Sequence, residues 1–267
     1  VSVGDLFVGA LLPGLGLVFL YISYIIVISF LNPEHVPSND SYNEDKVNIY
    51  DLLSALLPPL LLILAVLGSI IFGLATPTEA AGVGAFGALF LSILVKAFSF
   101  SKLLEVMRST VRISSMVFLI LIGASLFSLV FRGYGGDSLV HDLLVSLPGG
   151  IFGVMLVVMV LMFLLGFILD FIEITFVVVP IIGPILLTMG VDPIWLGVMI
   201  AINLQTSFLT PPFGFALFYL RGVAPNSVET SSIYRGVIPF VIIQIFALII
   251  LSLFPELATW LPSVVYG

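Results

Sequence analysis

Hydrophobic residues fill most of the chain in long blocks, which short polar connectors separate. The blocks cover residues 6–31, 52–74, 79–98, 113–131, 151–169, 172–190, 193–220 and 236–254. A helix that crosses a bilayer needs about 20 consecutive apolar residues, and most of the blocks reach this length. The pattern therefore predicts an all-α polytopic membrane protein.

Composition excludes several classes of protein. Of the 267 residues, 61% are hydrophobic and only 9% are charged, whereas a soluble domain is about half apolar and a quarter charged. A soluble enzyme is therefore excluded. The chain has no cysteine, which excludes thiolate metal sites and cysteine nucleophiles. A net charge of −7 provides no basic field for nucleic acid, so we expect no nucleic-acid partner.

Basic residues orient the predicted spans. When the eight blocks alternate across the membrane, one face receives every lysine and arginine except Arg132. These are Lys46, Lys96, Lys102, Arg108, Arg112, Arg221 and Arg235. Cytoplasmic loops retain basic residues, so we expect their connectors in the cytoplasm and the 132–150 connector and the C-terminal tail outside. Segment 101–108 reads as an interfacial amphipathic helix with its basic side toward lipid headgroups.

Two distant segments resemble each other. Residues 6–13 and 233–239 each lead into a long apolar run, and one gap aligns Gly9 with Gly236 and Pro13 with Pro239. The charge assignment gives the two segments opposite orientations, which is typical of the inverted repeats of secondary transporters. A match this short also arises by chance. If the repeat is real, residues 1–31 are the last element of a first repeat and 52–254 form the second.

An acidic break lies between the blocks 151–169 and 172–190. It contains Asp170 and Glu173, and no lysine or arginine occurs from 133 to 220 to pair with them. An unpaired carboxylate near the bilayer centre costs about 2.5–3.5 kcal/mol on insertion scales, which favours a functional role. The alternative is an exposed turn between two full spans. A re-entrant hairpin would combine the two interpretations, because its arms look like spans while its polar tip lies inside the protein.

A second break interrupts the block 193–220 at Thr210-Pro211-Pro212. Two consecutive prolines cannot continue a helix, so the helix unwinds and frees backbone carbonyls beside the hydroxyls of Thr206, Ser207 and Thr210. Such hard oxygen ligands suit a small alkali cation. The half-helix that begins near Gly214 presents free amides, which suit a carboxylate. A simple proline kink in a packed helix is the alternative.

Other motifs read as structural. Thr76-Pro77-Thr78-Glu79 has the form of a helix start, with Thr76 as the N-cap and Glu79 completing a capping box. The small residues Ala80, Gly84, Gly87 and Ala88 form a face that lets helices approach closely. We expect His141 on the surface of a short amphipathic connector rather than in a proton relay.

The ordered motifs together resemble one transporter family. They are Thr76-Pro77-Thr78-Glu79-Ala80-Ala81, Gly166-x-x-x-Asp170 followed by Pro180-x-x-x-Pro184, Gly190-Val191-Asp192-Pro193 and Thr210-Pro211-Pro212-x-Gly214. The set is similar to the C-terminal half of the large membrane subunit (DctM type) of tripartite ATP-independent periplasmic (TRAP) transporters, over essentially the whole chain. The resemblance implies the second inverted repeat of an elevator-type ion transporter fold, with a re-entrant hairpin and a broken helix. It places the chain in the bacterial or archaeal inner membrane.

The resemblance also implies the function and the partners. It indicates a sodium-coupled importer, not an enzyme, that takes an organic acid from a periplasmic binding protein, with sodium as coupling ion and no cofactor. Further partners are a small four-helix membrane subunit, the N-terminal half of the large subunit and the lipid bilayer. The residues alone leave two other functions open. One is a sodium-dicarboxylate carrier that works without a binding protein, and the other is a non-transporting membrane scaffold subunit.

The resemblance divides the chain and assigns its sites. The expected parts are a last helix of the missing first repeat (1–31), a cytoplasmic linker (32–51), scaffold and arm helices (52–150), a transport unit (151–222), and a final helix with an outer tail (223–267). We expect the sodium ligands among Gly166, Asp170, Thr206, Ser207, Thr210 and Pro211. We expect the substrate contacts among Asp170, Thr175, Gln205, Pro212 and Gly214.

Overall fold

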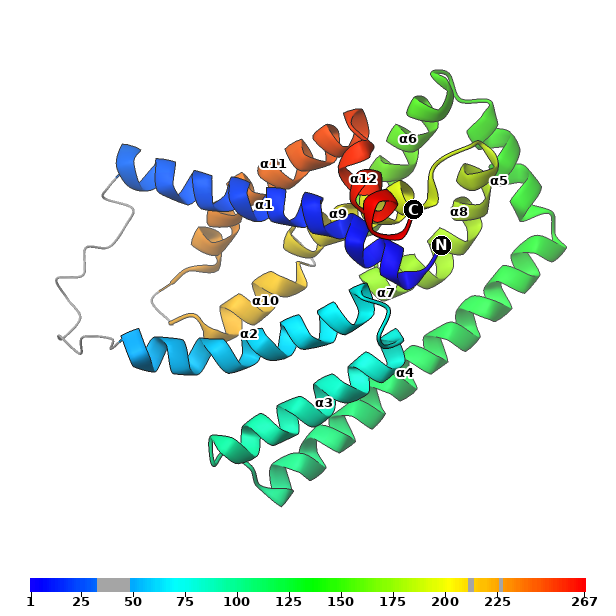
Figure 1. Ribbon diagram of the computed structural model, residues 1–267. Coiled ribbons are helices and arrows are strands. Elements are labelled where there is room, and N and C mark those ends of the chain that lie inside the picture. The colour runs from blue at the N-terminus through cyan, green and yellow to red at the C-terminus, as the bar shows by residue number, and fades with distance from the viewer. Residues whose placement is uncertain (33–48, 211–213, 226–227) are drawn as a thin grey trace. The chain divides into compact units, whose positions relative to one another are not determined.

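The computed structural model describes residues 1–32, 49–210, 214–225 and 228–267, and these form helices without any strand (Figure 1). Six of the described helical runs are long and apolar enough to cross a membrane. They are α1 (Val3–Leu31), the part Leu52–Ile71 of α2 (Ile49–Ile71), α3 (Pro77–Leu94), α4 (Phe100–Gly133), the run Phe171–Thr188 and α11 (Thr230–Leu253). The all-α, multi-pass class predicted from the hydrophobic blocks is confirmed at this level.

The two remaining blocks form shorter helices. Helix α6 (Gly150–Leu165) has 16 residues, and α9 (Pro193–Leu209) has 17. At ~1.5 Å per residue each is about 25 Å long, which is shorter than a hydrocarbon core of ~30 Å. Both end at the breaks that the sequence predicted. A further helix, α10 (Phe215–Val223), follows α9.

Contacts divide the chain into two compact units. The first contains Val1, Gly9–Tyr21 and Ile113–Gly267, and the second contains Ser2–Val8 and Ile22–Arg112. Helices α1 and α4 therefore contribute residues to both units. Most large apolar side chains of α2, α3 and α4 are exposed, as expected of a surface that faces lipid or another protein rather than water.

In the second unit, α2 and α3 run side by side (Figure 1). The small-residue face makes this approach close, as predicted. A Cβ atom on Gly84 would lie 3.3 Å from Val66, and one on Gly87 would collide with Leu62. Ala80, on the same face, is fully buried. The face therefore serves helix packing.

The predicted start of α3 is also confirmed. Thr76 has an extended backbone, Pro77 opens the helix, and the two side chains of the capping box satisfy each other's backbone amides. The Thr76 amide donates to the Glu79 carboxylate at 2.8 Å, and the Glu79 amide donates to the Thr76 hydroxyl at 3.4 Å. Both side chains are exposed.

In the first unit, α9 is the central helix. It packs against α6, α10, α11 and α12 (Glu256–Tyr266), and ten of its residues are buried. The core also includes Val158 and Met162 of α6 and Leu186 of α8 (Val179–Thr188). Because the segment before α9 must turn sharply, Gly190 takes the left-handed conformation at φ 90°, which costs glycine little.

Local sequence explains where α9 begins. Asp192 is its N-cap, and the carboxylate accepts hydrogen bonds from the amides of Ile194 and Trp195 at 2.9 Å. Pro193 occupies the first helical position, where a missing amide costs nothing. The buried indole of Trp195 donates to the carbonyl of Leu251 at 2.8 Å. This carbonyl lacks a helical partner because residue 255 is a proline.

Two segments differ from the prediction. Segment 101–108 is not a separate interfacial helix, because it is the first part of the continuous 34-residue α4. Nothing in its sequence stops a helix before the apolar stretch begins. The tail after α11 forms the additional helix α12, whose Ala258 is fully buried. Pro255 precedes that helix and Pro262 lies inside it. Because prolines usually interrupt helices, the sequence did not predict a helix here.

The connector between α4 and α6 carries α5 (Gly136–Val145). Its His141 is half-exposed and lies 3.3 Å from the carboxylate of Asp142, so the expected surface position is confirmed. Arg132 at the end of α4 forms an ion pair with Asp137 at 3.2 Å.

The two segments that resemble each other both lie in long helices with an internal proline, Pro13 in α1 and Pro239 in α11. Their glycines differ in surroundings. A Cβ on Gly9 would lie 2.7 Å from Ile194 and 2.9 Å from the Ala258 carbonyl, whereas Gly236 has open space around it. The aligned glycines therefore do not share a packing role.

Candidate functional site

The acidic break forms a tight turn between α6 and α7 (Phe171–Glu173). Asp170 is the N-cap of α7, and its carboxylate accepts a hydrogen bond from the Phe171 amide at 2.7 Å. The Glu173 carboxylate accepts one from the Asp170 amide at 3.2 Å. The two carboxylates thus find backbone partners in a capping box, although the sequence offers no basic partner nearby. Both residues are half-buried.

Beyond this turn the helix is irregular. Residues Ile174–Val178 form a π-helix, in which the Val179 amide donates to the Ile174 carbonyl five residues earlier. Pro180 follows and has no amide to donate. Single π-helical turns inside α-helices occur frequently at functional sites, and this one lies directly after Asp170 and Glu173.

The C-terminal end of α9 carries three hydroxyls. Each donates to the carbonyl four residues earlier: Thr206 to Ile202 at 2.8 Å, Ser207 to Asn203 at 3.2 Å and Thr210 to Thr206 at 2.8 Å. Each hydroxyl thus donates its one hydrogen to a carbonyl, and the lone pairs of the hydroxyl oxygen remain available as acceptors. Thr206 and Ser207 are buried and Thr210 is half-buried.

The helix ends where the prolines predicted. Helix α9 stops at Leu209, and Thr210 has an extended backbone at φ −99° and ψ 128°, the conformation favoured before a proline. The Gly214 amide donates to the Thr210 carbonyl at 3.0 Å. Pro211 and Pro212, expected to contribute to the ion and substrate sites, lie outside the described residues. Gly214 is buried at the start of α10.

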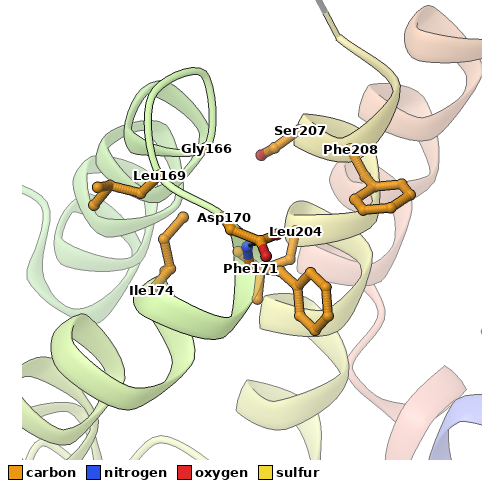
Figure 2. A pocket seen from close by; sticks show the side chains of 8 residues that line it. All are labelled: Gly166, Leu169, Asp170, Phe171, Ile174, Leu204, Ser207 and Phe208. Carbon is orange, nitrogen blue, oxygen red and sulfur yellow. Dashed lines mark hydrogen bonds between the residues drawn. The ribbon is translucent and has the colours of Figure 1, made fainter. Parts of the chain in front are cut away.

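The two breaks meet in space. A Cβ atom on Gly166 would collide with the side chain of Ser207, so only glycine permits this approach of the turn to α9. Asn203 strengthens it, because its buried side-chain amide donates to the Met159 carbonyl of α6 at 2.8 Å. Figure 2 shows Ser207 projecting from α9 toward the turn that carries Gly166 and Asp170.

Between the turn and α9 lies a small cavity (Figure 2). It encloses about 10 Å³ and is lined by Gly166, Leu169, Asp170, Phe171, Ile174, Leu204, Ser207 and Phe208. This volume is near the lower limit for one water molecule, so the cavity fits a single small ion rather than an organic acid. Three residues expected at the sodium site, Gly166, Asp170 and Ser207, therefore line one cavity.

A larger open groove adjoins the cavity. It measures about 370 Å³ and is lined by Phe171, Ala201, Leu204, Gln205 and Phe208. Phe171, Leu204 and Phe208 line both spaces, so a single wall separates them. The rings of Phe171 and Phe208 pack edge to face with centroids 6.1 Å apart. The exposed Gln205 is the one polar residue of this groove.

Some expected site residues lie elsewhere. Thr175 is exposed and donates its hydroxyl to the Phe171 carbonyl at 2.7 Å, and it lines neither space. Thr206 lies inside the helix packing rather than in the cavity wall. Sequence reasoning assigned no role to Asn203 or to the Phe171–Phe208 pair. A polar amide at the end of the apolar run 194–202 was the available signal for Asn203.

Comparison with known proteins identifies relatives over the whole chain. The family model "Tripartite ATP-independent periplasmic transporter, DctM component" matches residues 1–257. The chain is 27% identical over 270 residues to the sialic acid TRAP transporter large permease protein SiaM of Vibrio cholerae, covering 100% of this chain and 61% of that protein. The C4-dicarboxylate TRAP transporter large permease protein DctM of Pseudomonas aeruginosa is 28% identical, with 98% and 60% covered.

A third relative has a different substrate in its name. The ectoine/5-hydroxyectoine TRAP transporter large permease protein UehC of Ruegeria pomeroyi is 26% identical, with 100% of this chain and 61% of that protein covered. The chain thus spans about three fifths of the length of these relatives.

Proposed function

This chain belongs to the DctM component family of tripartite ATP-independent periplasmic transporters, a family of transporter permeases of the bacterial inner membrane, and we infer that it forms the C-terminal part of a large permease subunit. We propose that this permease imports an organic acid by sodium symport. The acid is delivered by a periplasmic binding protein, and a small four-helix membrane subunit and the N-terminal part of the permease complete the transporter. The relatives named for sialic acid and C4-dicarboxylates support a carboxylate substrate. The relative named for ectoine leaves the individual compound open.

The meeting of the two breaks is the observation that carries this proposal. A turn with a carboxylate, Asp170, lies against the hydroxyl-bearing end of a helix that stops at Leu209. The negative end of the α9 dipole favours a cation there, and the oxygens of Asp170 and Ser207 are hard ligands. The 10 Å³ cavity admits an ion of sodium's size. In the proposal, sodium binds in this cavity to oxygens of Asp170 and Ser207, whereas Thr206 and Thr210, also expected as ligands, do not line it.

The adjoining groove supports the substrate part of the proposal. Its volume of about 370 Å³ falls in the range of small-molecule sites. Gln205 provides a donor for a carboxylate in this groove; the start of α10 at Gly214, also expected at the substrate site, does not line it. Because Phe171, Leu204 and Phe208 line both spaces, an ion that fixes the turn also fixes one wall of the groove. This shared wall is the proposed basis of coupling.

The proposed mechanism is an elevator motion. In this proposal α6 to α8 form a re-entrant hairpin, α9 and α10 form the broken helix, and the chain is the second inverted repeat of the fold. Because α9 packs on α11 and α12 and Trp195 bonds to Leu251, those helices would move together with it. The moving part is then larger than residues 151–222. Each sodium that crosses 100 mV contributes about 2.3 kcal/mol to accumulation.

A serine pair tests the sodium site. Ser207 and Ser125 both donate to the carbonyl four residues earlier, but Ser207 lines the cavity and Ser125 is exposed on α4. In proteoliposomes that contain the complete transporter, we expect Ser207→Ala to raise the sodium concentration for half-maximal uptake about tenfold. Losing one hydroxyl ligand should weaken sodium binding by about 1.4 kcal/mol, which is similar to the loss of one hydrogen bond. We expect Ser125→Ala to leave the half-maximal sodium concentration unchanged. Equal sodium dependence in both variants would show that Ser207 is not a sodium ligand. Uptake that does not depend on sodium at all would contradict the proposed symport.

A further inference from the structure

The N-terminal part of α4 carries an unusual pair of charges for this chain. Arg108 and Arg112 lie one helical turn apart and line a polar groove with Ser101, Leu104, Glu105 and Ser109. All six residues are exposed. Among the described residues neither arginine makes an ion pair. We call Arg108 and Arg112 the α4 arginine pair.

The position of this pair along α4 relates it to the bilayer. The helix is continuous from Phe100 to Gly133, about 51 Å at ~1.5 Å per residue, so it is longer than the ~30 Å hydrocarbon core. Its uncharged stretch 113–131 is about 28 Å long by the same rise. Arg112 and Arg132 stand directly at the two ends of this stretch. If this stretch crosses the hydrocarbon core, both arginines would lie at the depth of lipid phosphates.

The two ends differ in how their charge is neutralised. Arg132 pairs with Asp137 at 3.2 Å, so the protein itself compensates that guanidinium. Lys102, near the other end, donates to the Ala97 carbonyl at 3.3 Å and lies outside the groove. The α4 arginine pair has no such partner in the described part of the chain. The groove holds two guanidiniums against one carboxylate, Glu105, so it remains net positive.

We propose that the α4 arginine pair binds the phosphate of an anionic phospholipid of the surrounding membrane. Guanidinium groups match phosphate oxygens in charge and in fork geometry, and the hydroxyls of Ser101 and Ser109 supply further donors in the same groove. The acyl chains of the lipid lie along the exposed apolar surface of the following turns, which include Met116 and Leu119. The site holds α4 at a fixed depth in the bilayer, a role separate from sodium and substrate binding.

Lipid retention measures this site directly. The purified transporter is exchanged into nanodiscs of phosphatidylcholine with a small fraction of phosphatidylglycerol, and the bound phosphatidylglycerol is counted by native mass spectrometry after release. A basic residue near an anionic surface contributes about fivefold in affinity. We therefore expect Arg108→Gln with Arg112→Gln to weaken phosphatidylglycerol retention roughly 25-fold by the same estimate. Arg132→Gln is the matched control and should retain the lipid as the unmodified protein does.

A gain of binding provides an independent check. Glu105→Gln removes the one carboxylate from the groove and should strengthen phosphatidylglycerol retention about fivefold, a result that misfolding does not produce. Unchanged retention in the double arginine variant would overturn the proposal. So would displacement of the lipid by millimolar inorganic phosphate, which would identify a site for the free anion. Loss of the small membrane subunit with normal lipid retention would also overturn it and assign the pair to a protein interface.

Discussion

Two turns in this protein use the same local motif in different surroundings. At Thr76–Glu79 and at Asp170–Glu173, an N-cap side chain and a glutamate three residues later satisfy each other's amides. The first box is exposed and starts the regular 18-residue α3. The second is half-buried and starts only 3 residues of α-helix before a π-helix, and its Asp170 lines the cavity with Ser207. The motif alone does not distinguish a helix start from a binding site, whereas the residues that face it do.

The glycines near the two boxes give the sharpest test and the largest expected effect. A Cβ on Gly166 would collide with Ser207, whereas Gly82, three residues after Glu79, has open space around it. Overpacking a close contact costs about 1–3 kcal/mol. We expect Gly166→Ala to lower the thermal stability in detergent and to abolish most sodium-driven uptake. Gly82→Ala should leave uptake intact and stabilise α3 slightly. If both variants transport normally, the contact of the turn with α9 has no role in function.

The next comparison separates the charge of Asp170 from its role as a helix cap. Asparagine caps a helix as well as aspartate does, so Asp170→Asn removes the charge and keeps the turn. We expect the sodium concentration for half-maximal uptake to rise about tenfold, because a ligand to a cation loses its charge, with little change in thermal stability. Removing the one charge of the other box by Glu79→Gln should alter neither quantity, although Glu79 is the third helical residue there and not the cap. A stability loss in Asp170→Asn without a sodium effect would identify the second box as structural, like the first.

Loss of the exposed cap should have the smallest effect. Thr76→Ala removes the N-cap of α3, which costs about 1 kcal/mol in typical helices. We expect this loss in the unfolding free energy, with unchanged sodium dependence of uptake. Thr76→Ser should restore the stability, because serine is an equivalent cap. A change in sodium dependence would show that the first box also communicates with the transport site.

Local signals predicted the features that depend on neighbouring residues. The cap at Thr76, the small-residue face of α3 and the end of α9 before Pro211 all follow from interactions within one helix or its nearest neighbour. The encounter of Gly166 with Ser207 was predicted only as part of a family resemblance, since the two residues are far apart in sequence. The pairing of Trp195 with Leu251 and the buried role of Asn203 left no local pattern. The continuity of α4 was missed because its polar first turns suggested a boundary, although none of these residues stops a helix. The helical tail α12 was missed because Pro255 and Pro262 suggested an interruption, whereas Ala258 and Pro262 are buried in the structure.

Pro255 leaves the Leu251 carbonyl without its helical partner, and the indole of Trp195 fills that vacancy. The chain contains two tryptophans, of which Trp195 is 7% exposed and Trp260 is 55% exposed. Their emission therefore comes from two distinct environments, one apolar and hydrogen-bonded, the other at the surface. Quenchers added from solution or lipid reach Trp260 first. The remaining fluorescence reports on whether α9 and α11 stay joined, so the protein carries its own optical probe of that contact.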